Sequence, residues 1–325
     1  MSTINVAILG ATGETGGSII NGLIESPTDF KITALTRQSS LDKPRSAALK
    51  QLGINVVPYD ISAPLEQQVQ QLRSIDIVIS AVGLGSVLDQ IPLATAAKKA
   101  GVKRFVPSFY ATVSPPSGII SIRDQKEEVL CHIKKLGLGY TVIDIGWWSH
   151  GFIPFVPSGR TDYARIETPP GRNTLPGTGD VPTAVTEVSD VGRFVARIVV
   201  DPRTLNKMVF MYGDVVTPNQ IFDLMERLSG EKVERRYVHE AELLSLLSKA
   251  REAIADGSDD PYAMMNVEVL QYVHSWGIEG HNTPEWAEYL GYLNGKELYP
   301  DLKGTSLEEF FKLLLDGKAK RLYSG

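Results

Sequence analysis

Cysteine is almost absent from this sequence, since Cys131 is the only one among 325 residues. A single cysteine excludes an internal disulfide and a zinc site built from several thiolates. His274, Glu279 and His281 lie near one another in the chain but lack the i, i+4 spacing of a zinc-binding helix. We therefore expect a surface cluster there and no bound metal.

An excess of positive charge is also missing. The chain has 33 Lys and Arg against 38 Asp and Glu, which gives a formal net charge of −5. Proteins whose main partner is nucleic acid or an anionic membrane carry a surplus of cations that meets the phosphates. We expect neither partner here.

Long apolar segments are the third absence. No stretch approaches the roughly 18 consecutive apolar residues of a membrane span. The first apolar run, Ile4–Leu9, is short and leads straight into glycines, and the first basic residue is Lys31. Because a secretory signal needs a charged start and a longer apolar stretch, we expect a cytoplasmic protein. We also expect it to be either a monomer or a homodimer.

Short apolar runs alternate with helical patterns through the first half of the chain. This alternation is typical of a parallel sheet covered by helices on both faces, and the handedness of crossovers favours a doubly wound, Rossmann-like α/β fold. The predicted strands are Ile4–Leu9, Lys31–Thr36, Asn55–Tyr59, Ile75–Ala81, Arg104–Pro107 and Tyr140–Ile145. The predicted helices are Ser18–Glu25, Ser46–Leu52, Leu65–Leu72, Pro92–Ala100 and Ile122–Leu136.

A glycine-rich turn follows the first strand. The stretch Gly10–Gly16 has the pattern G-x-x-G-x-x-G and opens a helix, which is the context that a dinucleotide-binding turn requires. Such glycines permit a sharp turn, a close approach of the pyrophosphate and tight packing of helix on strand. The alternative is a strand–helix turn without a ligand. The predicted cofactor contacts are Gly10, Ala11, Thr12, Gly13, Thr15 and Gly16.

The end of the second strand indicates which dinucleotide binds. An acidic residue there would hold a ribose 2′-hydroxyl, but no Asp or Glu occurs from Leu35 to Leu41, and Arg37 stands in its place. A guanidinium suits a 2′-phosphate, so the sequence favours NADP(H) over NAD. Lys43 either adds a second cation or is a solvated loop charge.

Further cofactor contacts are expected where the fourth and fifth strands end. Ligands of open parallel sheets lie at the carboxyl ends of the strands. Each candidate is also compatible with an ordinary turn. The candidates are Ser80, Ala81 and Val82 after the fourth strand, and Ser108 and Phe109 after the fifth.

A lysine lies on the apolar side of the predicted helix Ile122–Leu136. Lys126 is four residues after Ile122 and four before Leu130, so helical periodicity places it among apolar residues. An inward lysine is costly unless it is paired or useful, although its stem can also cover apolar surface while its ammonium reaches water. The same periodicity predicts Arg123 on the solvated side, and Cys131 is expected in the core.

The Tyr-x-x-x-Lys pair of ordinary short-chain reductases is not found near this helix. Only Tyr292–Lys296 and Tyr299–Lys303 have that spacing, and both are remote from the nucleotide-binding half. If this chain is such a reductase, Lys126 must act without that tyrosine.

The regular alternation of predicted strands and helices ends after Gly146. Residues 151–182 are rich in Gly and Pro and are predicted to be loops, and residues 239–325 are predicted to be mostly helical. We predict a nucleotide-binding domain over 1–150 and a substrate-binding region over 151–325 that partly returns to the sheet. Aromatic residues after the sixth strand either stack on a planar substrate or fill a domain interface; they include Trp147, Trp148 and Phe152.

Four stretches give the sequence a family resemblance, which extends over nearly the whole chain. It resembles the isoflavone reductase-like and NmrA-like branch of the atypical short-chain dehydrogenases. The stretches are Gly10–Gly16, Thr36-Arg37, Lys103–Ser108, and Lys126 with Tyr140-Thr141. The resemblance implies an NADPH-dependent reductase of small aromatic, often phenolic, molecules, with Lys126 as general acid or base.

The sequence departs from the plant reductases directly after Ser108. They usually continue Ser-Glu-Phe-Gly, whereas this chain has Phe109-Tyr110-Ala111. We expect a different substrate, and Tyr110 is predicted either to offer it a hydroxyl or to be an aromatic wall residue. The alternative function is that of a non-catalytic NADP-sensing regulator, which the inward Lys126 disfavours.

Overall fold

The structure is a computed structural model that describes residues 3–323, and it divides into two compact units. The predicted division at residue 150 concerns function and stays a prediction. Unit 1 comprises the described part of Met1–Tyr110, Asp124–Ile143 and Val188–Val209; unit 2 comprises Ala111–Arg123, Asp144–Glu187 and the described part of Phe210–Gly325.

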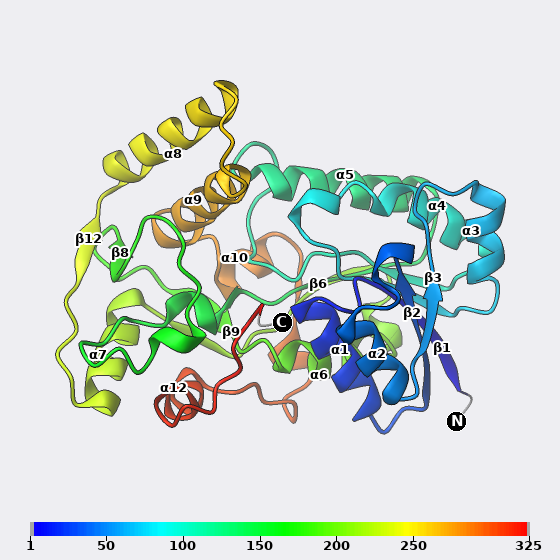
Figure 1. The fold of residues 1–325 in the computed structure, drawn as a ribbon, viewed down its shortest axis with the longest axis horizontal. Coiled ribbons are helices and arrows are strands. Elements are labelled where there is room, and N and C mark those ends of the chain that lie inside the picture. The colour runs from blue at the N-terminus through cyan, green and yellow to red at the C-terminus, as the bar shows by residue number, and fades with distance from the viewer. Residues whose placement is uncertain (1–2, 324–325) are drawn as a thin grey trace. The chain divides into compact units, whose positions relative to one another are not determined.

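Unit 1 contains the predicted doubly wound α/β core (Figure 1). Five parallel strands have the order β3-β2-β1-β4-β5, and Leu9 of β1 is paired with Leu35 of β2 and with Ser80 of β4. The carboxyl ends of these three strands are therefore level. The strands of this sheet are β1 (Ile4–Leu9), β2 (Phe30–Thr36), β3 (Asn55–Pro58), β4 (Ile77–Ser80) and β5 (Arg104–Val106). Two further strands, β6 (Thr141–Asp144) and β10 (Lys207–Phe210), lie outside it.

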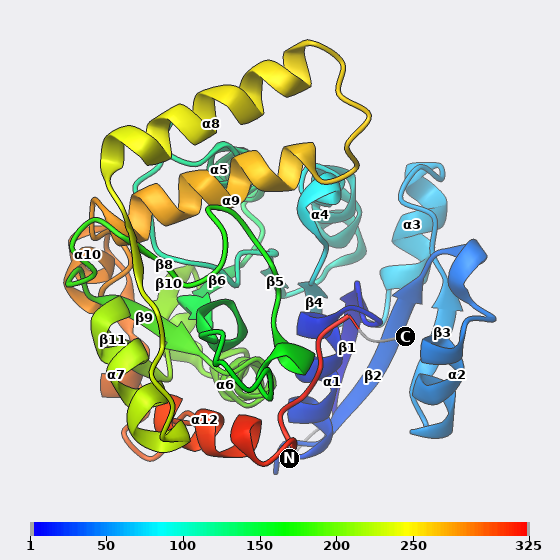
Figure 2. The ribbon, with the colours of Figure 1, turned by 60° about the vertical axis from the view of Figure 1, so that its left-hand side comes forward.

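Helices cover both faces of this sheet. Figures 1 and 2 show α3, α4 and α5 on one side and α1, α2 and α6 on the other. The predicted helix at Ser18 begins earlier, at Glu14, because Gly16 packs directly against the turn and allows the helix to start there. The helices are α1 (Glu14–Ile24), α2 (Pro44–Gln51), α3 (Leu65–Leu72), α4 (Gln90–Ala100), α5 (Ser121–Lys135) and α6 (Asp190–Ile198).

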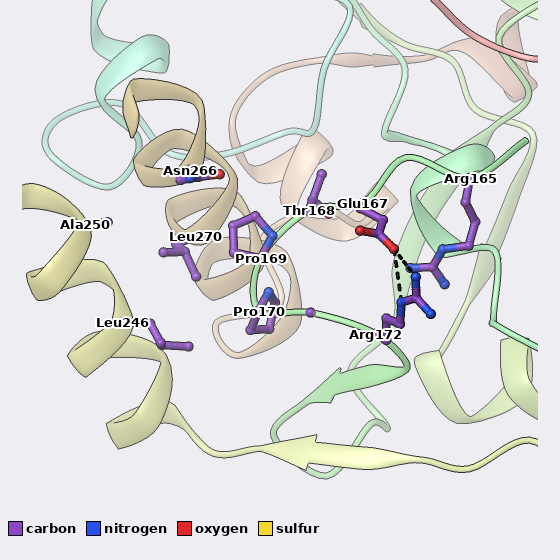
Figure 3. Close-up of a pocket in the computed structure, with 11 residues that line it drawn as sticks. Arg165, Glu167, Thr168, Pro169, Pro170, Arg172, Leu246, Ala250, Asn266 and Leu270 are labelled. Carbon is purple, nitrogen blue, oxygen red and sulfur yellow. Dashed lines mark hydrogen bonds and ion pairs between the residues drawn. The ribbon is translucent and has the colours of Figure 1, made fainter. Parts of the chain in front are cut away.

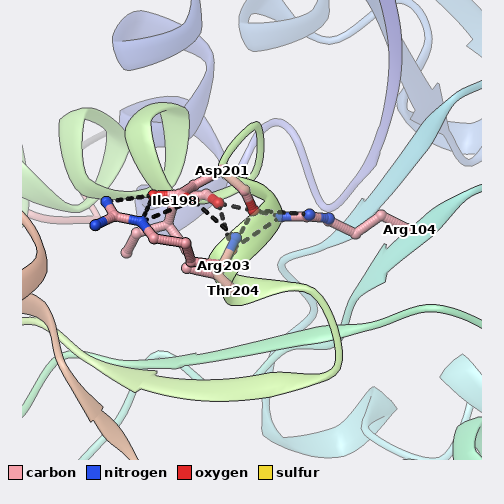
Figure 4. Close-up of polar contacts among 5 residues, drawn as sticks. All are labelled: Arg104, Ile198, Asp201, Arg203 and Thr204. Atoms are coloured by element: carbon pink, nitrogen blue, oxygen red, sulfur yellow. Dashed lines mark hydrogen bonds and ion pairs between the residues drawn. The ribbon is translucent and has the colours of Figure 1, made fainter.

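A buried arginine at the start of β5 holds the end of α6 (Figure 4). Arg104 donates hydrogen bonds to the carbonyl oxygens of Ile198 and Asp201 at 3.1 and 2.9 Å, and to the hydroxyl of Thr204 at 3.0 Å. These acceptors include carbonyls at the C-terminus of a helix, where a cation is favourable. The contact explains how a buried charge is tolerated at this position.

Helices α1 and α6 pack backbone to backbone through a pair of glycines. A Cβ added to Gly22 would lie 2.0 Å from the carbonyl carbon of Gly192. We expect Gly22→Ala to lower the free energy of unfolding by about 1–3 kcal/mol, because the helices must separate. Gly17→Ala is the matched control in the same helix, since its Cβ would meet nothing within 4 Å, and it should be neutral or stabilising by up to about 1 kcal/mol. Equal urea midpoints for the two variants would contradict this close packing.

Unit 2 contains two small sheets, β11-β9-β7 and β12-β8, with the remaining helices. The prediction of loops throughout 151–182 was wrong at β8, because three residues are too few to show a period in the sequence. The strands are β7 (Trp147–Trp148), β8 (Thr174–Pro176), β9 (Thr183–Thr186), β11 (Asp214–Val216), β12 (Arg236–Val238) and β13 (Leu293–Asn294). The helices are α7 (Pro218–Ser229), α8 (Glu240–Ala255), α9 (Ala263–Gly277), α10 (Pro284–Tyr289), α11 (Gly295–Leu298) and α12 (Leu307–Leu315).

The long apolar face that a membrane span would need is missing from residues 3–323, because none of their helices is both long enough and apolar enough to cross a bilayer.

Candidate functional site

The glycine turn between β1 and α1 has the sharp form that a phosphate cradle needs. Gly10 has a φ of +85°, and a Cβ there would lie 2.3 Å from the carbonyl oxygen of Ala81. A Cβ on Gly16 would lie 2.1 Å from the carbonyl oxygen of Gly10. The N-cap residue of α1 is Gly13, which has no side chain to cap the first helical turn, and the N-terminus of a helix is favourable for an anion. The turn fits the phosphates of a dinucleotide.

Three cations lie in the segment that follows β2. Arg37 and Lys43 are both exposed. Arg45, which sequence reasoning missed, reaches back to the glycine turn: it donates to the carbonyl oxygen of Thr12 at 2.8 Å and pairs with Glu14 at 3.1 Å. The available signal was a basic residue directly after Pro44, in the first turn of α2 and two residues from Lys43.

The predicted cofactor contacts after β4 and those after β5 touch one another. The Ser108 hydroxyl donates to the carbonyl oxygen of Val82 at 2.9 Å, and the Ser108 N–H donates to Gln90 Oε1 at 2.7 Å. The hydroxyl of Ser80 is buried and has no hydrogen-bond partner among the residues that the structure describes. The two strand ends thus form one connected edge beside the glycine turn, because Ala81 also faces Gly10.

Lys126 is buried, as the apolar side of α5 predicts. It is 7% exposed, and its Nζ donates a hydrogen bond of 2.6 Å to the carbonyl oxygen of Phe109. The same Nζ lies 5.8 Å from the centre of the Phe109 ring. The structure therefore brings Lys126, the candidate acid, to Phe109, a predicted cofactor contact after β5.

Two other predictions for α5 were wrong. Cys131 is exposed, because the residue after Leu130 lies about 100° around the helix from it. Arg123 is buried at 4% exposure. It donates to Asp144 Oδ2 at 3.1 Å and to the Tyr292 hydroxyl at 2.9 Å. Partners that are distant in sequence make its burial possible, and periodicity does not reveal them.

Tyr110 is the last residue of the first segment of unit 1. Its backbone has a φ of +36°, its side chain is buried, and its hydroxyl has no hydrogen-bond partner among residues 3–323. Burial raises the pKa of Tyr110 well above its ordinary value. The hydroxyl therefore stays protonated and remains a donor.

The aromatic candidates of unit 2 contact other aromatic rings. Trp147 lies 5.0 Å from Tyr272 and Phe152 lies 5.0 Å from Trp276, between ring centres. Trp147, Phe152 and Trp276 also line a small void of about 60 Å³. Trp148 does not line that void, and its ring centre lies 6.5 Å from that of Tyr323.

The residues found around His274 differ from the predicted cluster of His274, Glu279 and His281. His281 is buried and hydrogen-bonds to Ser275 at 3.1 Å. Glu240 takes its place and contacts His274 Nε2 at 3.0 Å. Ligand atoms of Glu240, His274 and Glu279 lie within 4.8 Å of one another, but exposed acidic groups of this kind are common without a metal.

Comparison with known proteins identifies close relatives of this chain. It is 48% identical over 318 residues to the asnovolin J 5′,6′-dehydrogenase of Aspergillus novofumigatus, with 97% of this chain and 96% of the relative covered. It is 31% identical to a probable pinoresinol-lariciresinol reductase of Arabidopsis thaliana, with 95% and 97% covered.

Solved structures share the fold over nearly their whole length. The binary complex of leucoanthocyanidin reductase with NADPH from Vitis vinifera superposes with a TM-score of 0.79 at 25% identity, covering 96% of this chain and 99% of that one. The chain also matches the NmrA-like family over residues 2–311. On this match and on its similarity to the dehydrogenase along almost its full length, the chain belongs to the NmrA-like family.

Proposed function

We propose that this chain transfers a hydride between NADP(H) and a small aromatic or phenolic molecule, with Lys126 as the general acid or base. The single observation that carries the proposal is the buried Lys126 ammonium, which is held against the carbonyl oxygen of Phe109 at the strand edge that continues from the glycine turn. An inward lysine beside the predicted coenzyme contacts favours catalysis over sensing alone, because it can supply a proton there.

The chain is an NADPH-dependent oxidoreductase of the isoflavone reductase-like kind. Its relatives are named dehydrogenase and reductase, and a structural neighbour is a complex with NADPH. The glycine turn is suited to hold the pyrophosphate, and Arg37, Lys43 and Arg45 provide positive charge in the segment where a 2′-phosphate is expected.

When bound, NADPH supplies the hydride. The protein then has to exclude water and place a proton. Lys126 Nζ donates this proton to the substrate atom that becomes negative in a reduction, and accepts one in an oxidation. Its low exposure strengthens the electrostatic stabilisation of that developing charge, because little water screens it.

Both directions of hydride transfer occur among the names of the relatives, since one is a dehydrogenase and another a probable reductase. Lys126 can serve in either direction by changing between acid and base. The proposal therefore covers both the reduction and the oxidation of a small aromatic or phenolic molecule.

Arg37 is expected to determine the preference for the phosphorylated coenzyme. Arg37→Gln should raise the Kd for NADPH by about tenfold or more and leave that for NADH almost unchanged, because only NADPH has a 2′-phosphate to pair with a guanidinium. Calorimetric titration measures both constants. Lys31→Gln, an exposed cation at the start of β2, is the matched control. An equal loss for both coenzymes would contradict the assignment.

The proposed function is tested by following NADPH absorbance with a panel of aromatic enones, ketones and phenolic ethers, and NADP⁺ reduction with their products. Turnover with at least one of them is expected. Binding of NADPH without turnover in either direction, together with capture of a regulatory protein whose affinity NADP⁺ alters, would favour the sensor instead.

A further inference from the structure

Unit 2 contains a pocket of about 450 Å³ whose lining includes none of the residues predicted to hold the coenzyme or to transfer the proton (Figure 3). Its lining comes from the loop 165–172 and from helices α8 and α9. A volume of this size holds a small organic molecule. The question is which chemistry its walls would select.

One side of the pocket is apolar. Four apolar residues line this side: Leu246 of α8, Leu270 of α9, and the loop residues Pro169 and Pro170. None of these side chains can donate or accept a hydrogen bond. This side favours hydrocarbon or an aromatic ring over a polar group.

The other side carries two guanidinium groups and one carboxylate. Arg172 donates to Glu167 Oε1 at 2.6 Å, and Arg165 donates to the carbonyl oxygen of Ile153 at 2.6 Å. Figure 3 shows both arginines close to Glu167. Arg172 is paired with Glu167, and the charges of Glu167 and Asp162 both act on Arg165.

The two cations are held in place before any ligand arrives. The guanidinium carbons of Arg165 and Arg172 lie 3.2 and 4.1 Å from the centre of the Phe155 ring. Arg165 Nε is buried and has no hydrogen-bond partner in the described part of the chain, and burial lowers the pKa of Arg165 to about 10. A desolvated cation with an unused donor is stabilised by an added anion.

We propose that this pocket binds an organic anion with an apolar body, its carboxylate paired with Arg172 and Arg165 and its hydrocarbon part packed against Leu246, Leu270 and the prolines. Planar guanidinium groups match the two oxygens of a carboxylate. The narrower void beside Trp147 and Trp276 shares Arg165 and Pro170 with the pocket, so the site has room for a ligand larger than a single ring. The proposal is independent of NADPH.

The test is calorimetric titration of the full chain, without coenzyme, using three probes that share one ring system. They are 1-naphthoate, 1-naphthalenemethanol and 1-naphthylmethylammonium. We expect 1-naphthoate to bind at least about tenfold more tightly than the neutral alcohol, and the ammonium compound to bind most weakly. Equal affinities for the three probes, or binding of none, would overturn the proposal.

Variants with opposite charge changes separate binding from a loss of folding. Arg172→Gln should weaken 1-naphthoate by about tenfold, whereas Glu167→Gln should tighten it, because the competing carboxylate is removed. Both side chains are exposed, at 68% and 64%, so the fold tolerates the changes. Leu246→Glu should weaken binding by repulsion, and Arg227→Gln, at a distant surface pair with Glu308, should leave it unchanged. A change in the same direction for Arg172→Gln and Glu167→Gln would overturn the proposal.

Discussion

Lys126→Met is expected to lower turnover by about 10²- to 10⁴-fold, the usual contribution of a positioned acid or base. Methionine retains most of the length and apolar surface of the lysine stem, so packing in α5 should persist. What disappears is the ammonium that contacts the Phe109 carbonyl at 2.6 Å. The Kd for NADPH should change much less than kcat, because no phosphate contact is removed.

The measurement is steady-state kinetics with calorimetry of NADPH binding on the same preparations. Lys134→Met is the matched control, since Lys134 is an exposed lysine of the same helix. It should retain full turnover. If Lys126→Met also retained full turnover with normal coenzyme binding, the proton donor would have to be another group.

The second large effect is on stability and concerns the buried network of Arg123, Asp144 and Tyr292. Asp144 Oδ2 accepts from Arg123 at 3.1 Å and from the Tyr292 hydroxyl at 2.6 Å, and Asp144 Oδ1 accepts from the Ala111 N–H at 3.2 Å. Burial and the nearby Asp144 charge raise the pKa of Tyr292, which keeps it a donor. Asp144→Ala removes the negative charge that Arg123 faces, and we expect a loss of about 3–5 kcal/mol.

Urea unfolding followed by circular dichroism measures this loss. Glu308→Ala is the matched control, because Glu308 is an acidic residue paired with Arg227 and Lys312 on the surface, where pairs contribute about 1 kcal/mol or less. Asp144→Asn should lie between the two, since it retains the oxygen acceptor without the charge. If Asp144→Ala were no worse than Glu308→Ala, Asp144 would not compensate the buried arginine.

The sheet and the glycine turn could be predicted from the sequence because they depend on local patterns. Ile4–Leu9 is a continuous apolar run, and Leu65–Leu72 has a clear helical period; the structure has both elements with these bounds. Thr217 and Pro218 are residue types that favour the start of a helix, and a capping box is found there. In each case the signal lies within a few neighbouring residues.

Features that depend on distant partners could not be predicted. The strands β7 and β13 have two residues each, too few to show an alternation. Arg123 is buried because Tyr292, which is 169 residues away, meets it. Arg45 reaches the glycine turn across 33 residues. A single sequence carries no mark of such pairings, whereas the inward Lys126 was visible from its position in one helix.

The central claim is that the nucleotide-binding half of the chain binds NADPH in preference to NADH. Its most direct test is a calorimetric titration of NADPH into the unmodified protein, with NADH titrated in parallel. The glycine turn and the cations after β2 predict saturable binding of NADPH, at least about tenfold tighter than that of NADH. Absence of heat with NADPH, or equal affinity for the two coenzymes, would contradict it.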